Sequence, residues 1–259
     1  MADLHLGLGL DRTSTSTASQ VAAQMSRELI TTAAGRGAKR IVIAGDSKHP
    51  IVGVPALLRP LLFEFFAELL EAGFRVDAIL GNHDVGLVPG LPREVKVFPP
   101  SGMVIDDVGI FHGHCWPSKQ VLSASQLVVG HLHPGYRFAP TADEEAPKRR
   151  CWVRAELDPA ALDPSARDRY PIRSRRIVVL PAFHPLAGTE ALNKESPARG
   201  RSFLFQRFLS RGNCRAYLLD GTDLGRLELS GPSPVRPNAT TGRSSRPPSR
   251  ARDTGSRSK

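Results

Sequence analysis

Five short polar clusters in the first half of the chain constrain its fold more than any other feature. Each contains Asp, Asn or His, which supply oxygen and nitrogen ligands to divalent metals. In order, the clusters are Asp3-Leu4-His5, Gly45-Asp46-Ser47-Lys48-His49, Gly81-Asn82-His83-Asp84, Gly113-His114 and Gly130-His131-Leu132-His133. If they form one site, the fold must bring together segments that are far apart in the sequence.

Four of the clusters follow short apolar runs, at residues 41–44, 78–80, 108–111 and 127–129. Runs of this length that are rich in Val and Ile predict buried strands. The glycine that opens each of these clusters allows a close turn. Because open α/β sheets bind ligands beyond the carboxyl ends of their strands, we expect the clusters to meet at one sheet edge.

The residue types and their spacing favour a transition-metal site. Asp3 and His5, and likewise His131 and His133, are two residues apart, so in extended backbone each pair projects to one side. Carboxylate, amide and imidazole ligands together suit Mn, Fe or Zn better than copper or an all-oxygen calcium site. The residues leave the choice of metal open.

Singly, each cluster has an ordinary explanation as a turn, a surface loop or a packed histidine pair. Five of them in one order, mostly behind apolar runs, make coincidence a poor explanation. Together they resemble the calcineurin-like metallophosphoesterase superfamily, whose pattern is Asp-x-His, Gly-Asp, Gly-Asn-His-Asp or Glu, Gly-His and Gly-His-x-His. The resemblance implies an α/β fold, a calcineurin-like sandwich of two mixed β-sheets flanked by helices.

Two further segments resemble one branch of this superfamily, which is encoded beside a large helicase and a DNA ligase in bacterial repair operons. They are Gly45-Asp46-Ser47-Lys48-His49 and Leu180-Pro181-Ala182-Phe183-His184-Pro185-Leu186. The resemblance implies DNA as the substrate, and a helicase and a DNA ligase as partners.

The resemblance also implies two metal ions, with Mn expected and Fe or Zn as alternatives. The first would be held by Asp3, His5, Asp46 and His133, and the second by Asp46, Asn82, His114 and His131. A shared carboxylate can bridge two cations about 3.5–4 Å apart. The neutral Asn oxygen limits the negative charge of the site.

Three residues near these ligands resemble catalytic residues. His83 would act as a general acid that donates a proton to the leaving oxygen, and Asp84 would orient its ring, or else only cap the loop. His49 could contact the phosphate. Lys48 could do the same or remain solvated, and His112 could support the site or pack as a strand histidine.

One departure from the family pattern concerns the first cluster. Only Met1 and Ala2 precede Asp3, so the strand that should position the first ligand pair is expected to be missing, unless the start is misassigned. In its absence we expect Asp3 to fray and the first metal to bind weakly.

Length and composition predict one domain and a tail. Residues 1–230 form the expected metallophosphoesterase domain, because 259 residues with 41% hydrophobic content suffice for a core. Residues 231–259, rich in Pro, Ser, Gly and Arg, predict a disordered basic tail. This tail could bind nucleic acid through counterion release, or its arginines could simply reflect high-GC coding.

The remaining pattern alternates helix and strand. Helices are predicted over residues 19–34 and 54–73, with Pro60 either kinking the second or marking its start. Strands are predicted at 95–98, 103–105, 151–154, 175–180 and 214–219, a tight turn at 106–107, and loops at 142–148 and 156–169. No membrane span or signal peptide is recognisable. Three cysteines without ligand spacing favour reduced thiols in a cytoplasmic protein.

The functional hypothesis is a two-metal phosphodiesterase, a Mn-dependent DNA endonuclease linked to DNA repair. One alternative is a phosphoesterase for a nucleotide or a cyclic phosphodiester, because the same metal pair serves many substrates on one fold. Another is a weakly active nucleic-acid-binding subunit associated with a helicase, which the missing first strand would favour.

Overall fold

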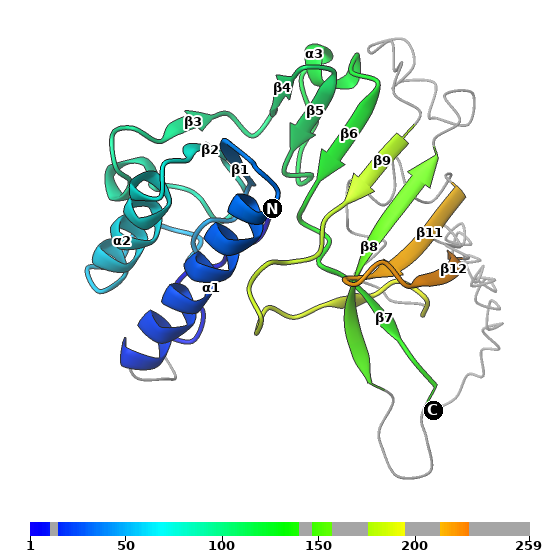
Figure 1. Cartoon of the computed structure of the whole chain (residues 1–259), viewed down its shortest axis with the longest axis horizontal. Coiled ribbons are helices and arrows are strands. Elements are labelled where there is room, and N and C mark those ends of the chain that lie inside the picture. The colour runs from blue at the N-terminus through cyan, green and yellow to red at the C-terminus, as the bar shows by residue number, and fades with distance from the viewer. Residues whose placement is uncertain (11–14, 140–146, 157–175, 195–212, 228–259) are drawn as a thin grey trace, which may run out of the picture.

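The computed structural model describes residues 1–10, 15–139, 147–156, 176–194 and 213–227. They form an α/β sandwich of two β-sheets, with two long helices packed on the smaller sheet (Figure 1). This architecture confirms the predicted fold class. The predicted tail and most of the predicted loops at 142–148 and 156–169 lie outside the described residues.

The smaller sheet is parallel throughout. Its strands lie in the order β1 (Arg40–Ala44), β2 (Arg75–Ile79) and β3 (Lys96–Phe98). Helices α1 (Thr15–Gly35) and α2 (Leu58–Glu71) bury their apolar faces against it. Pro60 lies in the first turn of α2, where its missing N–H needs no helical partner, so it marks the start of the helix. Neither helix, nor any other described one, is long and apolar enough to cross a membrane.

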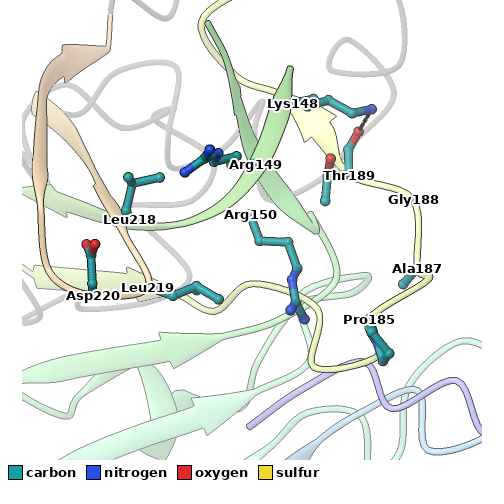
Figure 2. Close-up of a pocket in the computed structure, with 10 residues that line it drawn as sticks. All are labelled: Lys148, Arg149, Arg150, Pro185, Ala187, Gly188, Thr189, Leu218, Leu219 and Asp220. Atoms are coloured by element: carbon teal, nitrogen blue, oxygen red, sulfur yellow. Dashed lines mark hydrogen bonds between the residues drawn. The ribbon is translucent and has the colours of Figure 1, made fainter. Parts of the chain in front are cut away.

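The larger sheet is mixed. Its main path runs β10 (Glu190–Ala191), β7 (Pro134–Arg137), β8 (Lys148–Glu156), β9 (Arg176–Val179), β6 (Gln126–Val129), β5 (Val108–Phe111) and β4 (Met103–Ile105). Strand β11 (Asn213–Leu218) pairs with β8 and with β12 (Asp223–Leu227). Short helices α3 (Lys119–Leu122) and η1 (Val88–Gly90) complete the described elements. At the start of β8, the Lys148 ammonium donates a hydrogen bond to the carbonyl of Thr189 (Figure 2).

Most of the predicted strands are present within one to three residues of their expected bounds. The sequence did not predict β7, β10 or β12. Strand β7 reads Pro-Gly-Tyr-Arg and β12 contains a central glycine, a composition typical of turns rather than strands. Pairing with β8 and β11 supplies their ladder hydrogen bonds, so tertiary context determines these strands.

The segment from Met1 to Leu6 lies between the two sheets. The Ala44 amide donates to the Met1 carbonyl at 2.8 Å, and the Asp3 amide donates to the Gly45 carbonyl at 3.0 Å. On the other side, the Phe183 amide donates to the Ala2 carbonyl at 3.0 Å. Within the described chain no regular strand precedes β1, and the segment makes only isolated bridges. It is nevertheless held on both sides, so the expected fraying of Asp3 is wrong.

Three apolar side chains, two of them alanines, fill the junction of the sheets beside this segment. Ala2, Ala44 and Leu180 form a buried cluster of their own, separate from the two larger cores. Because Ala2 and Ala44 are compact, the backbones on either side can approach one another closely here. The junction places the carboxyl ends of β1, β6 and β9 around Asp3 and His5.

The thiols give the first testable prediction. Cys151 and Cys214 are fully buried, none of the three cysteines forms a disulfide, and burial raises the pKa of both buried thiols to about 12. Since the thiolate is the reactive form, native protein at mildly alkaline pH should react with a disulfide reagent only at Cys115. Cys151 and Cys214 should react after unfolding by guanidinium. Rapid labelling of all three thiols in the native protein would contradict this burial.

Candidate metal centre

Five loops and segments bring the predicted ligand clusters to one edge of the sandwich. Asp46 follows β1, Asn82 follows β2, His112 follows β5 and His131 follows β6, all at the carboxyl ends of parallel strands. The segment from Met1 to Leu6 inserts among them. The structure therefore brings together clusters that the sequence separates by up to 130 residues, as expected for a sheet-edge site.

The first group of potential ligands is Asp3, His5 and His133. His133 Nε2 lies 3.2 Å from Asp3 Oδ1 and 3.2 Å from His5 Nε2. His5 Nε2 also lies 3.7 Å from Asp46 Oδ2. Two ligand atoms bound about 2.1 Å from one metal lie about 3.0–3.5 Å apart. These spacings therefore suit a single cation held by the group.

The second group is Asp46, His112 and His131. His112 Nε2 lies 3.3 Å from Asp46 Oδ2 and 3.2 Å from Asn82 Oδ1. The same Asp46 oxygen thus faces both groups, His5 on one side and His112 on the other. A carboxylate in that position can bridge two cations, so the donor set fits a dinuclear site.

His112 occupies the ligand position that the sequence pattern predicted for His114. The His112 side chain is fully buried, and its Nδ1 donates to the Ala44 carbonyl at 2.9 Å. His114 belongs to none of the three potential metal groups found in the described residues, and its Nδ1 is buried without a hydrogen-bond partner there. Gly113, at φ 115°, turns the chain between them. The available signal was position, because His112 directly follows the last residue of β5.

The backbone at the site is strained. Six non-glycine residues in the described chain have positive φ, and five of them are expected metal ligands. These five are Asp3 (φ 59°), His5 (40°), Asp46 (53°), His131 (71°) and His133 (44°). Such conformations cost roughly 1–3 kcal/mol each and persist where the surroundings enforce them, often at functional sites. The clustering of this strain on the ligand residues supports a functional role for the site.

Two motif glycines are required by close packing against the ligands. A Cβ atom at Gly45 would lie 2.2 Å from His112 Nδ1, and one at Gly81 would lie 2.2 Å from Asp46 Oδ1. Gly45 also has φ 90°, a conformation that favours glycine. The glycines thus make room for the ligand side chains as well as forming the turns.

The local electrostatics keeps two of the four ligand imidazoles neutral and so prepares them for metal binding. Burial lowers the pKa of His5 to about 3 and that of His131 to about 4, so both are neutral at neutral pH, as ligation requires. His112 and His133 differ, because nearby carboxylates outweigh the effect of burial. The hydrogen bond to Asp46 and the charges of Asp3 and Asp46 raise the pKa of His112 to about 9, and the hydrogen bond to Asp3 together with its charge raises the pKa of His133. The proximity of His112 holds the pKa of Asp46 below its usual range despite burial.

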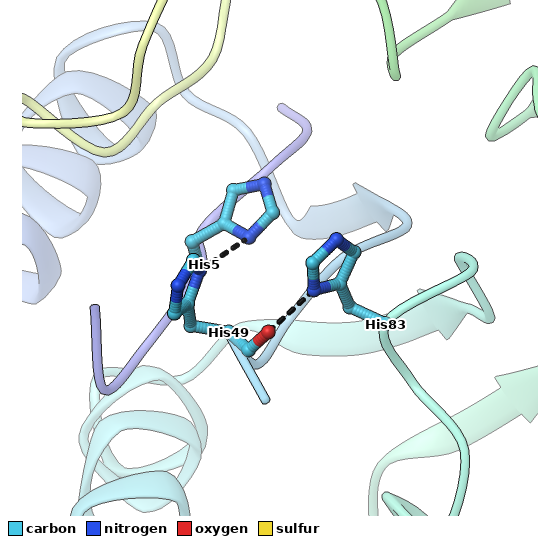
Figure 3. A group of neighbouring side chains, drawn as sticks. All are labelled: His5, His49 and His83. Atoms are coloured by element: carbon cyan, nitrogen blue, oxygen red, sulfur yellow. Dashed lines mark hydrogen bonds between the residues drawn. The ribbon is translucent and has the colours of Figure 1, made fainter. Parts of the chain in front are cut away.

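A third group of potential ligands is His5, His49 and His83 (Figure 3). It lies beside the Asp46 carboxylate. His83 Nδ1 donates to the His49 carbonyl, and the two rings stack with centroids 5.7 Å apart. His83 Nε2 lies 3.9 Å from Asp46 Oδ2. The His49 carbonyl therefore fixes the His83 ring through Nδ1 and leaves Nε2 facing the metal ligands.

Asp84 takes the alternative role that the sequence left open. Its carboxylate accepts hydrogen bonds from the amides of Gly81, at 2.8 Å, and Lys48, at 3.2 Å. Burial raises its pKa. Asp84 thus caps the loop and joins it to the neighbouring loop, while the His49 carbonyl orients His83 in its place.

Lys48 neither faces the ligands nor remains solvated, so both expected placements are wrong. The side chain is fully buried, and the ammonium donates to the main-chain carbonyls of Pro50, Ile51 and His83. An ammonium has three N–H donors, and this arrangement uses all of them. Lys48 therefore ties the loop that carries Asp46 to the loop that carries His83.

Lys48→Met should destabilise the protein strongly. The substitution keeps an apolar stem of similar length but leaves three carbonyls without their charged donor, so we expect the free energy of unfolding to fall by about 2–4 kcal/mol. Urea denaturation followed by circular dichroism measures the loss. Lys39→Met is the matched control, because Lys39 is exposed just before β1. Equal effects of the two substitutions would contradict the role given to Lys48.

Comparison with known proteins reveals likeness in structure alone. No protein-family model and no curated protein matches the sequence. Among solved structures, the nuclease MPE from Pseudomonas putida matches with a TM-score of 0.52 and 18% sequence identity, over 86% of this chain and 86% of that chain. At this identity the match establishes that the two chains share a fold.

Proposed function

We propose that this chain is a metal-dependent phosphodiesterase that cleaves DNA, with Mn as its metal. The observation that carries the proposal is the pair of overlapping ligand groups that share the Asp46 carboxylate. The fold, which is shared with a protein described as a nuclease, and the family pattern of the motifs add support. The repair setting, the cytoplasmic location, and a helicase and a ligase as partners are proposed from residues 45–49 and 180–186.

In this proposal the first metal is held by Asp3, His5, Asp46 and His133. The second is held by Asp46, Asn82, His131 and His112, with His114 as the ligand that the family pattern alone would choose. Carboxylate, amide and imidazole donors fit Mn, Fe or Zn. When bound, such a pair of cations activates water and balances the charge that develops on the phosphate.

The protein groups position the phosphodiester and transfer its proton. His83 Nε2 is directed toward the ligands because Nδ1 is committed to the His49 carbonyl, so it can donate a proton to the leaving oxygen. The half-buried His49 imidazole stacks on His83 and can contact a non-bridging phosphate oxygen. Asp84 acts through the loop that it caps.

His83→Ala should lower kcat on DNA by about a hundredfold, within the usual range for loss of a general acid. The loss on bis-p-nitrophenyl phosphate should be smaller, because p-nitrophenolate leaves without much help from an acid. Steady-state kinetics on both substrates in Mn test this difference. Equal losses on both would assign His83 to phosphate binding instead.

The experiment that tests the function is cleavage of circular single-stranded DNA in Mn, with bis-p-nitrophenyl phosphate assayed in parallel. Loss of cleavage in Asp46→Asn would link the activity to this site. Cutting of the circle supports an endonuclease. Hydrolysis of the small diester alone would replace it with a small-molecule phosphoesterase, and DNA binding without hydrolysis would replace it with a nucleic-acid-binding subunit.

A further inference from the structure

A basic pocket adjoins the metal centre. It lies between the start of β8, the loop after β9 and the turn that joins β11 to β12, and has a volume of about 570 Å³ (Figure 2). Its lining includes Lys148, Arg149, Arg150, Gly188 and Asp220. The pocket is open to solvent on one side, because Lys148 and Arg149 are exposed.

The cations of this pocket are not neutralised by the contacts they make. Lys148 donates to the carbonyl of Thr189, and Arg150 Nη1 donates to the carbonyls of Ala182 and Phe183, each at 3.0 Å. These acceptors are uncharged. Arg149 lies over the Phe138 ring at 5.9 Å. Among the described residues, Asp220 lines the same pocket and its carboxylate interacts electrostatically with Arg149, but no carboxylate forms an ion pair with these three cations. Three cations against one carboxylate leave the pocket with a net positive charge.

The pocket and the metal centre share a wall. His133 Nδ1 donates to the carbonyl of Gly188 at 2.9 Å, and Gly188 lines the pocket. Arg150 binds the Phe183 carbonyl, while the Phe183 amide binds the carbonyl of Ala2, next to Asp3. The loop after β9 therefore separates the two sites by the thickness of one backbone.

We propose that this basic pocket binds a second phosphate of a polynucleotide while the metal centre holds the phosphate that is cleaved. The inference rests on the proposed function and deepens it. Positive side chains beside a catalytic centre position a polyanion through its backbone without reading its sequence. A small diester has a single phosphate and cannot use the pocket, so the pocket selects a strand over a small molecule.

The test is the double variant Lys148→Gln/Arg149→Gln, with Arg150 retained because it holds the loop after β9. The matched control is Arg36→Gln/Lys39→Gln, which removes the same charge from exposed positions at the amino end of β1. The probe is a fluorescein-labelled oligothymidylate in EDTA, so that binding is measured by anisotropy without cleavage. Both variants keep residues 231–259, so the predicted basic tail is the same in each.

We expect the pocket variant to bind the probe about fivefold to tenfold more weakly than the control variant. The slope of the logarithm of its binding constant against the logarithm of salt concentration should be shallower by about 1. In Mn, the ratio of kcat/KM on DNA to that on bis-p-nitrophenyl phosphate should fall by a similar factor. If the protein cleaves DNA and the two variants have equal probe affinities and equal kcat/KM ratios, the pocket does not bind a second phosphate, while the proposed function stands. If the protein hydrolyses no diester but the pocket variant still binds the probe more weakly than the control, the pocket binds polynucleotide and the proposed hydrolytic function is wrong.

Discussion

Asp46→Asn should abolish metal-dependent hydrolysis of phosphodiesters, with a loss of about a thousandfold or more. Its Oδ2 faces His5 at 3.7 Å and His112 at 3.3 Å, so this one oxygen serves both ligand groups. The lowered pKa of Asp46 keeps it ionised across the working pH range. Removing the charge weakens the binding of both cations at once. A loss of about 4 kcal/mol in transition-state stabilisation corresponds to a roughly thousandfold lower rate.

The substitution is chosen so that the fold survives it. Asp46 has φ 53°, a left-handed conformation that Asn tolerates better than most residues. The Asn carboxamide oxygen can still accept the His83 amide, which lies 2.9 Å from Asp46 Oδ1. The backbone conformation and this hydrogen bond should therefore persist, while the midpoint of thermal unfolding without metal should fall because buried His112 loses its charged partner.

Calorimetric titration with Mn, together with hydrolysis of bis-p-nitrophenyl phosphate, measures the effect. Asp107→Asn is the matched control, because Asp107 is exposed in the turn between β4 and β5, at the amino end of β5. It should keep full activity. Substantial Mn-dependent hydrolysis by Asp46→Asn would show that the two ligand groups do not share this carboxylate.

The parts of the fold that the sequence predicted are those that local pattern determines. Strands β1, β5 and β6 are short apolar runs followed by glycine or histidine, and their burial alone specifies them. Strand β7 begins with Pro-Gly, and its pairing with β8 and β10 makes it a strand. The residues of β7 alone do not predict with which strands it pairs.

The site shows the same division. The sequence identified the clusters but could not determine the direction in which each side chain points. Gly113 turns the chain so that His112 rather than His114 joins Asp46. Lys48 and Asp84 act through hydrogen bonds between two loops about 36 residues apart, and such contacts depend on the packing of β1 against β2.

The segment from Met1 to Leu6 is where the structure differs most from the sequence prediction. The sequence predicted a lost strand and a frayed Asp3, because two residues cannot form a buried strand. The structure instead binds the segment through main-chain hydrogen bonds to Gly45 and to the loop after β9. Single bridges on both sides replace a continuous ladder, and Asp3 is completely buried.

His112→Gln should abolish activity about as severely as Asp46→Asn, whereas His114→Gln should reduce it only a fewfold. His112 Nε2 lies within 3.3 Å of both Asp46 Oδ2 and Asn82 Oδ1, while His114 belongs to none of the ligand groups of the described chain. Stabilisation by Mn separates ligand loss from misfolding. Mn should raise the unfolding midpoint of the parent and of His114→Gln, and should raise that of His112→Gln much less.

Proton release during Mn binding distinguishes the two histidines independently of activity. With a pKa of about 9, His112 is protonated at neutral pH in the metal-free protein, so a cation must displace about one proton to use it. Affinity for Mn should therefore rise with pH until His112 is deprotonated. His114, whose pKa burial lowers to about 4, has no proton to release. Calorimetry in buffers of different ionisation enthalpy should show about one proton fewer released in His112→Gln than in the parent, and no such difference between the parent and His114→Gln. The reverse pattern would restore His114 as the ligand, as the motif alone implied.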